Sequence, residues 1–171
     1  LHNDPQSVTR RRCTSLRHLI GQTPMVALHC RVDGQERTVF AKHETRNYTG
    51  SIKDRMALHI LERAHASGDI APGDVIAEAT SGNTGIAFAA VGRALGHSVR
   101  IYMPDWMSRE RKQLIASLGA EIVSVSKEEG GFLGSIDLAR QYAAEHAHVF
   151  LPSQFDNRAN VLAHAETTGP E

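Results

Sequence analysis

The chain has 171 residues, and its 19 lysines and arginines are balanced by 19 aspartates and glutamates. This length suits one domain, or one domain and a fragment. The zero formal charge argues against a nucleic-acid or an anionic-membrane partner, because either would favour an excess of basic residues. No apolar stretch approaches the roughly 20 residues of a membrane span, and no signal peptide is visible.

Two cysteines, Cys13 and Cys30, are too few for a disulfide framework, so we expect a reducing, cytoplasmic setting. The ten histidines are scattered without the spacing of metal ligands, and no zinc site is predicted. The chain begins with Leu1 and stops at Glu171, and neither end resembles a natural terminus.

The first predicted elements are irregular. Residues 1–18 are polar and basic without a clear period, so we expect them to be poorly ordered unless they dock on another surface. The basic run at residues 10–12 is interpreted as a solvated arm. A short strand is predicted at 38–42. Apolar residues at helical spacing then predict a helix that begins after Ser51 and ends at Gly68.

From residue 75 onward, strands and helices alternate. The predicted strands are 75–77, 99–103, 121–125 and 149–151. The predicted helices are 86–95, 109–118, 133–146 and 156–167. This alternation predicts an α/β fold of three layers, in which helices cover both faces of a mainly parallel sheet.

Ligands bind such sheets where loops leave the carboxyl ends of the strands, and two loops stand out, residues 47–53 and 80–85. In the first loop, Lys53 lies in the first turn of a helix, where the helix dipole and burial would both favour a neutral amine. A neutral amine attacks aldehydes, so Lys53 is a candidate Schiff-base residue. The alternative is a surface lysine paired with Asp54 or with an acid elsewhere.

The second loop, T-S-G-N-T-G at residues 80–85, joins a strand to a helix. Backbone N–H groups at a helix start bind anions, and Gly82 and Gly85 allow close backbone approach. The loop lacks the lysine of a phosphate loop and the spacing of a dinucleotide site, so a small carboxylate fits best. The alternative is a well-capped helix start without a ligand. Gln154, after the last strand, could reach a ligand held over both loops, although a simple turn is the alternative there.

Together these segments resemble the cysteine synthase family of pyridoxal-phosphate enzymes, which have fold type II. The resemblance covers residues 19–171 and is closest to the cysteine synthase B branch. The similar motifs are L-I-G-Q-T-P-M-V at 19–26, G-S-I-K-D-R at 50–55, E-A-T-S-G-N-T-G at 78–85, the stretch 103–111, Q-F-D-N at 154–157 and T-T-G-P-E at 167–171.

The resemblance implies pyridoxal 5'-phosphate as the cofactor, held by Lys53, which would then act as the base for the α-proton, and bonded by Asn83. The residues implied to bind the substrate are Thr80, Ser81, Gly82, Thr84 and Gln154. The implied reaction is β-replacement on an activated serine such as O-acetylserine, in which sulfide or another thiol donor adds to form cysteine. A homodimer is implied for the full-length form.

Members of this family continue well past the T-G-P-E segment. The resemblance therefore implies an N-terminal arm at 1–36 that would pack on a larger domain, a smaller α/β domain with the cofactor lysine at 37–152, and the start of the larger domain at 153–171. Tyr48 and Phe132 depart from the residues usual in the family, which leaves the chemistry intact but affects substrate choice. Two alternatives stay open: a non-catalytic α/β module with a binding or regulatory role, and another fold type II enzyme such as cystathionine β-synthase.

Overall fold

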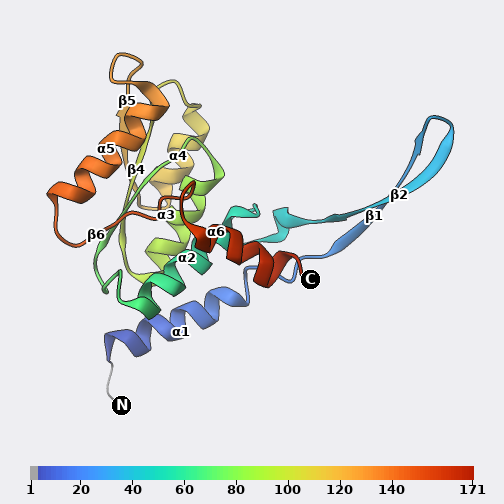
Figure 1. The fold of residues 1–171 in the computed structure, drawn as a ribbon, viewed down its shortest axis with the longest axis horizontal. Helices are drawn as coiled ribbons and strands as arrows, with labels where there is room; N and C mark the ends of the chain where they lie inside the picture. The colour runs from blue at the N-terminus through green and yellow to red at the C-terminus, as the bar shows by residue number, and fades with distance from the viewer. Residues whose placement is uncertain (1–3) are drawn as a thin grey trace.

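The computed structural model describes residues 4–171. Its centre is a four-stranded sheet whose strands pair in parallel in the order β5-β4-β3-β6 (Figure 1). The strands are β3 (Val75–Ala79), β4 (Ser98–Pro104), β5 (Glu121–Val125) and β6 (Val149–Phe150). The helices that follow the predicted alternation are α2 (Lys53–Ser67), α3 (Asn83–Leu95), α4 (Arg109–Ser117), α5 (Gly131–Glu145) and α6 (Arg158–Ala163). The predicted α/β fold is thus confirmed, with small shifts at the ends of the elements.

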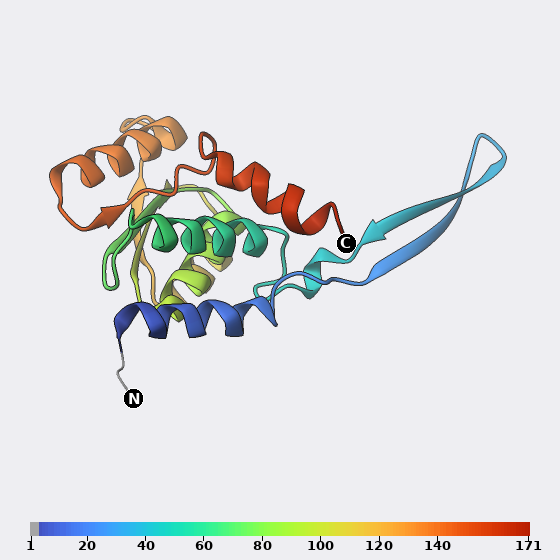
Figure 2. The same ribbon diagram turned by 60° about the horizontal axis from the view of Figure 1, so that its bottom comes forward.

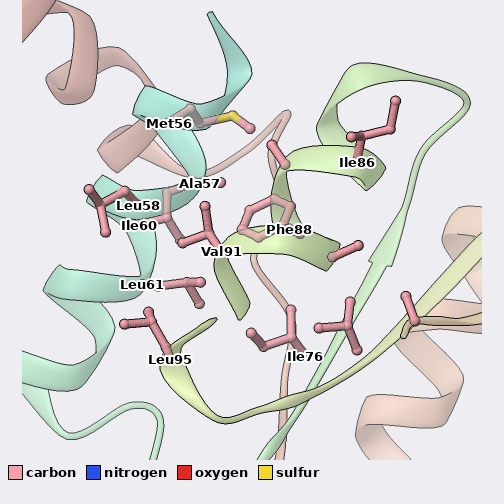
Figure 3. Close-up of a cluster of buried hydrophobic side chains, with 14 of the residues drawn as sticks. Met56, Ala57, Leu58, Ile60, Leu61, Ile76, Ile86, Phe88, Val91 and Leu95 are labelled. Carbon is pink, nitrogen blue, oxygen red and sulfur yellow. The ribbon is translucent and has the colours of Figure 1, made fainter. Parts of the chain in front are cut away.

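Two hydrophobic clusters cover the two faces of the sheet. The larger one packs α3 between the sheet and α2, with Phe88 and Ile76 fully buried at its centre (Figure 3). The smaller one packs Ala139 of α5 against Ala77 and Tyr102 on the opposite face. Each fully buried large side chain contributes roughly 1.5–3 kcal/mol, so these clusters hold the three layers together.

Small residues let α3 approach the sheet closely. A Cβ atom on Gly92 would lie 2.8 Å from both Ile76 Cδ1 and Val99 Cγ2. The helix ends at Gly96, which has φ +102°, the left-handed conformation that glycine adopts without steric cost. The small residue at position 92 therefore reflects a tight contact between helix and sheet.

The N-terminal segment is helical, contrary to the absence of a clear period in its sequence. Helix α1 (Pro5–Arg17) buries Thr9, Cys13 and Leu16 against α2 and α3, a helical spacing that the polar Thr9 conceals. Arg12 Nη1 donates to the Leu95 carbonyl oxygen at 2.8 Å, where a cation interacts favourably with the carboxyl end of α3. Residues 4–18 thus dock on the domain, and residues 1–3 lie outside the described residues.

A second difference is a β-hairpin that extends away from the domain (Figure 1). Strand β1 (Met25–Val32), which was not predicted, pairs antiparallel with β2 (Gln35–Lys42), of which only residues 38–42 were predicted. Asp33 and Gly34 both have positive φ, as a two-residue turn of type I′ requires. The loop at 47–53 therefore follows a hairpin strand, and the expectation that it leaves the carboxyl edge of the parallel sheet is wrong.

The C-terminal segment packs back onto α2. Helix α6 contacts α2 and continues into a π-helical turn, η2 (His164–Thr168), that ends near the base of the hairpin (Figure 2). Another short element, the 3₁₀ turn η1 (Glu44–Arg46), links the hairpin to the loop before Lys53. Between residues 4 and 171, no helix combines the length and apolarity needed to cross a membrane.

Gly134 tests how closely α5 packs on the turn that precedes it. A Cβ atom at this position would overlap the Glu129 carbonyl oxygen, which is backbone and has no flexible route away. We expect Gly134→Ala to lower the free energy of unfolding by on the order of 3 kcal/mol, measured by urea denaturation. The neighbouring exposed Leu133→Ala is the control and is expected to change it by less than about 0.5 kcal/mol. An equal effect of both variants would contradict this packing.

Candidate functional site

Lys53 is the first residue of α2 and is half-buried. Its backbone N–H donates to the Ser51 hydroxyl at 3.2 Å, so Ser51 stabilises the helix start as predicted, although the residue that immediately precedes the helix is Ile52. Within residues 4–171, Nζ of Lys53 forms no hydrogen bond or ion pair. The alternative of a lysine paired with Asp54 therefore loses support.

Asp54 is fully buried and fixes the loop in front of Lys53. Its carboxylate accepts hydrogen bonds from the backbone N–H of Thr49, at 2.6 Å, and from the Thr49 hydroxyl. Burial raises the pKa of Asp54, and these hydrogen bonds oppose that rise. The acid next to the lysine thus anchors residues 49–54 into one turn rather than neutralising the amine.

Arg55 joins this turn to the base of the hairpin and to the C-terminal segment. Its guanidinium is 1% exposed and bonds Glu44 at 2.7 Å and Glu171 at 2.7 Å. Although burial opposes the change, hydrogen bonds from Arg55, Thr23 and Asn47 lower the pKa of Glu44 to about 2. Since these residues come from four separate segments, Arg55 holds the segments around the lysine together.

Residues 80–85 form the loop between β3 and α3. Thr80 is buried and its hydroxyl accepts from the Gly82 N–H at 3.3 Å. Gly82 faces open space, whereas a Cβ atom on Gly85 would lie 2.8 Å from Thr80 Cγ2. Gly82 is therefore the glycine that leaves room for a ligand, and Gly85 serves the packing of α3 on the loop.

The start of α3 offers free hydrogen-bond donors. Among the described residues, the backbone N–H groups of Asn83 and Thr84 have no acceptor. Such groups at a helix start, together with the helix dipole, bind small anions. Ser81 lies beside them on the loop, and its carbonyl oxygen accepts from Arg111 Nη1 at 3.3 Å. The five predicted residues of this loop thus lie together at one helix start.

Gln154 joins this loop from the turn after β6, the strand that pairs directly with β3. Its Oε1 accepts from the Thr84 hydroxyl at 2.7 Å, and its Nε2 donates to the Ala79 carbonyl oxygen at 3.3 Å. The turn is therefore more than a simple turn, since it places the Gln154 amide against the loop at residues 80–85. No hydrogen bond joins the Lys53 side chain directly to this loop among residues 4–171.

These observations fit a pyridoxal-phosphate site. The fit rests on an unpaired half-buried amine, a helix start with free N–H groups and an open approach over Gly82. Lys53 would hold the cofactor aldehyde and Asn83 would contact its ring, while the loop would hold a carboxylate. The chain's own residues thus provide one half of such a site.

Within the described part of the chain, the fold and site define an α/β protein with an unpaired lysine at one helix start and free backbone N–H groups at another. Residues 16–171 match the family model described as pyridoxal-phosphate dependent enzyme, and the chain therefore belongs to this family. It is 44% identical to a cysteine synthase of Staphylococcus aureus over 92% of its own length and 50% of the relative's. It is 43% identical to cysteine synthase B of Escherichia coli, over 92% and 52% of the two chains.

A solved structure agrees with this assignment. A hydrogen sulfide-producing enzyme of Fusobacterium nucleatum has a TM-score of 0.91 and 52% identity, over 94% of this chain and 48% of that one. The chain spans about half the length of these relatives. The resemblance to the cysteine synthase family and to fold type II is thus confirmed.

Three site-supporting residues were not assigned from the sequence. Asp54 and Arg55 stand in the quoted lysine motif, and Glu78 stands in the loop motif, so the motifs themselves were the available signal. His164 of η2 is a fourth such residue and lies near Lys53. Burial and then the positive charge of Lys53 lower the pKa of His164. Sequence spacing gives no signal for His164, because the segment returns to the lysine only through the packing of α6 on α2.

Proposed function

We propose that the complete protein containing residues 1–171 performs pyridoxal-phosphate-dependent β-replacement on an activated serine and forms cysteine. The observation that carries the proposal is the free Lys53 amine in the same domain as an open carboxylate-binding helix start. When bound, the cofactor supplies an electron sink for bonds broken at the substrate's α-carbon. Its phosphate would be held by residues outside this chain.

The residues of this chain divide the work. Lys53 would bind the cofactor aldehyde and, once displaced by the substrate amine, remove the α-proton. The loop 80–85 and Gln154 would hold the substrate carboxylate, so that the proton faces the lysine. In this arrangement the substrate carboxylate would accept from the N–H groups of Asn83 and Thr84 at the start of α3, which are free within residues 4–171.

A larger domain would complete the site. We propose that residues 1–36 form an arm whose hairpin part packs on the larger domain while its helix α1 stays docked on α2 and α3. Residues 37–152 would be the smaller domain, and residues 153–171 would begin the larger one. The exposed apolar residues of the hairpin support this arrangement, with Phe40 69% exposed and Leu28 50%. The predicted boundary at 36/37 falls inside the hairpin, so both strands would move with the arm. A cytoplasmic homodimer remains the expected full-length form.

A second candidate is the release of hydrogen sulfide. The chain is 52% identical to a hydrogen sulfide-producing enzyme, compared with 43–44% for the cysteine synthases. Cysteine carries a β-thiol where O-acetylserine carries acetate, so the same residues could expel sulfide from cysteine. The two functions differ in the favoured leaving group and not in the carboxylate site.

Steady-state assays of the complete protein test the proposal. We expect cysteine formation from O-acetylserine and sulfide to have a higher kcat/KM than sulfide release from cysteine. Dominant sulfide release would favour the second candidate. Preference for serine or O-phosphoserine with homocysteine would indicate a cystathionine β-synthase instead. Activity with none of these substrates would favour a non-catalytic module.

A further inference from the structure

Glu78 is a buried carboxylate that the proposed reaction does not use. It is the penultimate residue of β3 and is 3% exposed. Its Oε1 accepts from the Ala79 N–H at 2.9 Å, and its Oε2 accepts from the Gln154 N–H at 3.2 Å. The side chain therefore connects the end of β3 to a loop that lies more than seventy residues later in the sequence.

That loop adopts an unusual backbone conformation to make this contact. Ser153 has φ +51°, a left-handed value that few residues other than glycine adopt. Its carbonyl oxygen accepts from the N–H groups of Asp156 and Asn157, both at 2.9 Å, which closes the turn. A left-handed residue turns successive N–H groups toward one point and so creates a small anion-binding concavity. The Glu78 carboxylate occupies this concavity.

The contact also fixes a side chain of the carboxylate-binding site. With its backbone N–H on Glu78, Gln154 directs its amide to the Ala79 carbonyl oxygen, at 3.3 Å, and to the Thr84 hydroxyl, at 2.7 Å. Asn160 Nδ2 holds the Gln154 carbonyl oxygen at 3.0 Å from the other side. Glu78 is thus the only acidic anchor of the Gln154 backbone among the described residues.

We propose that Glu78 is a positioning residue, whose carboxylate holds Gln154 and, through it, Thr84 in the geometry that binds the substrate carboxylate. The inference rests on the proposed function for its effect on substrate binding. Its structural part, the attachment of the 151–157 segment to β3, stands independently of the reaction.

The position of Glu78 makes this attachment sensitive to pH near neutrality. Burial raises the pKa of Glu78 to about 7, against the opposing effect of the N–H groups of Ala79, Gln154 and Ser153. The charged groups that line the adjoining cavity of about 460 Å³ are Asp137 and Arg140 of α5 and Asp156 of the loop. Arg140 pairs with Asp156 at 3.2 Å. Since the neighbours of Glu78 are N–H donors, its ionised form holds the loop and its protonated form loosens it.

Two variants of the complete protein test the proposal. Glu78→Gln keeps the shape of the side chain but turns an N–H donor toward the backbone N–H groups that the carboxylate accepts from. Glu121→Gln, which removes an exposed carboxylate on β5, is the control. At pH 8 we expect Glu78→Gln to raise KM for O-acetylserine about tenfold and to change kcat by less than about threefold, because ground-state and transition-state binding are lost equally. In the wild type, KM should rise as the pH falls through about 7, and in Glu78→Gln it should be independent of pH there.

Hydrogen–deuterium exchange supplies a measurement that does not depend on activity. In Glu78→Gln the peptide spanning residues 151–157 should exchange faster at pH 8 than in the wild type, and Glu121→Gln should leave it unchanged. The proposal is overturned if residues 151–157 exchange at the same rate in Glu78→Gln as in the wild type. It is also overturned if they exchange faster but KM is unchanged, or if only kcat falls. If the protein lacks β-replacement activity altogether, the exchange measurement still decides the role of Glu78, while the failed assay concerns the proposed function alone.

Discussion

Replacing Lys53 by Ala in the complete protein is expected to abolish the visible absorption of the lysine–cofactor linkage and to lower β-replacement by about 10³-fold or more. Lys53 is the residue proposed both to bind the cofactor aldehyde and to move the α-proton, so its loss removes two functions at once. The measurements are an absorption spectrum with added pyridoxal phosphate and a cysteine-forming assay.

Lys112→Ala is the matched control for this variant. Lys112 is a half-buried lysine of α4 whose Nζ donates to the Asp105 carbonyl oxygen at 2.6 Å, and among the described residues it forms no hydrogen bond to either loop of the site. We expect its absorption and activity to match the wild type. Wild-type absorption in Lys53→Ala would assign the linkage to another lysine.

Arg55→Met is expected to have the largest effect on stability, a loss of about 3–5 kcal/mol in the free energy of unfolding. The guanidinium is 1% exposed, and its removal leaves the Glu44 and Glu171 carboxylates without their main partner. Urea denaturation at pH 7 measures the loss. Arg140→Met, which breaks an exposed pair with Asp156, is the control and should cost less than about 1 kcal/mol.

The same variant should change the dependence of stability on acid. The pKa of Glu44 is lowered from 4.5 to about 2, so its ionised form contributes stability above pH 4.5 that is lost as the pH falls toward 2. In Arg55→Met this contribution is reduced, because only the hydrogen bonds from Thr23 and Asn47 remain, and the loss of stability between pH 4.5 and 2 should be smaller than in the wild type. A loss of the same size in both proteins would show that Arg55 does not hold Glu44.

Most of the sheet could be predicted, because its strands and helices bury apolar residues at regular spacing. The elements that were not predicted, β1 and α1, lack the regular burial of apolar residues that marks the other strands and helices. Strand β1 is exposed along its whole length in the described part of the chain. No alternation of buried and exposed side chains therefore marks it as a strand. The Asp33-Gly34 pair, a strong signal for a two-residue hairpin turn, was overlooked. The buried face of helix α1 is difficult to recognise in the sequence. Thr9 and Cys13 form much of this face, and the residues around them are mainly polar and basic.

The site could be predicted as a set of residues but not as an arrangement. The motifs identify Lys53 and the loop 80–85, because lysine at a helix start and small polar residues at another have recognisable chemistry. What holds them in place depends on contacts between distant segments: Arg55 with Glu171, and Glu78 with Gln154. Only the folded chain brings these pairs together, so residue spacing carries no signal for them.

Borohydride reduction of the complete protein, followed by trypsin digestion and mass spectrometry, tests the central claim most directly. Reduction fixes the cofactor on its lysine and blocks cleavage there, so modification of Lys53 predicts one peptide from Asn47 to Arg55 that carries a phosphopyridoxyl group. Without reduction, the same segment should be cleaved after Lys53. A phosphopyridoxyl group on any other lysine, or on none in a protein saturated with the cofactor, would contradict the assignment of Lys53.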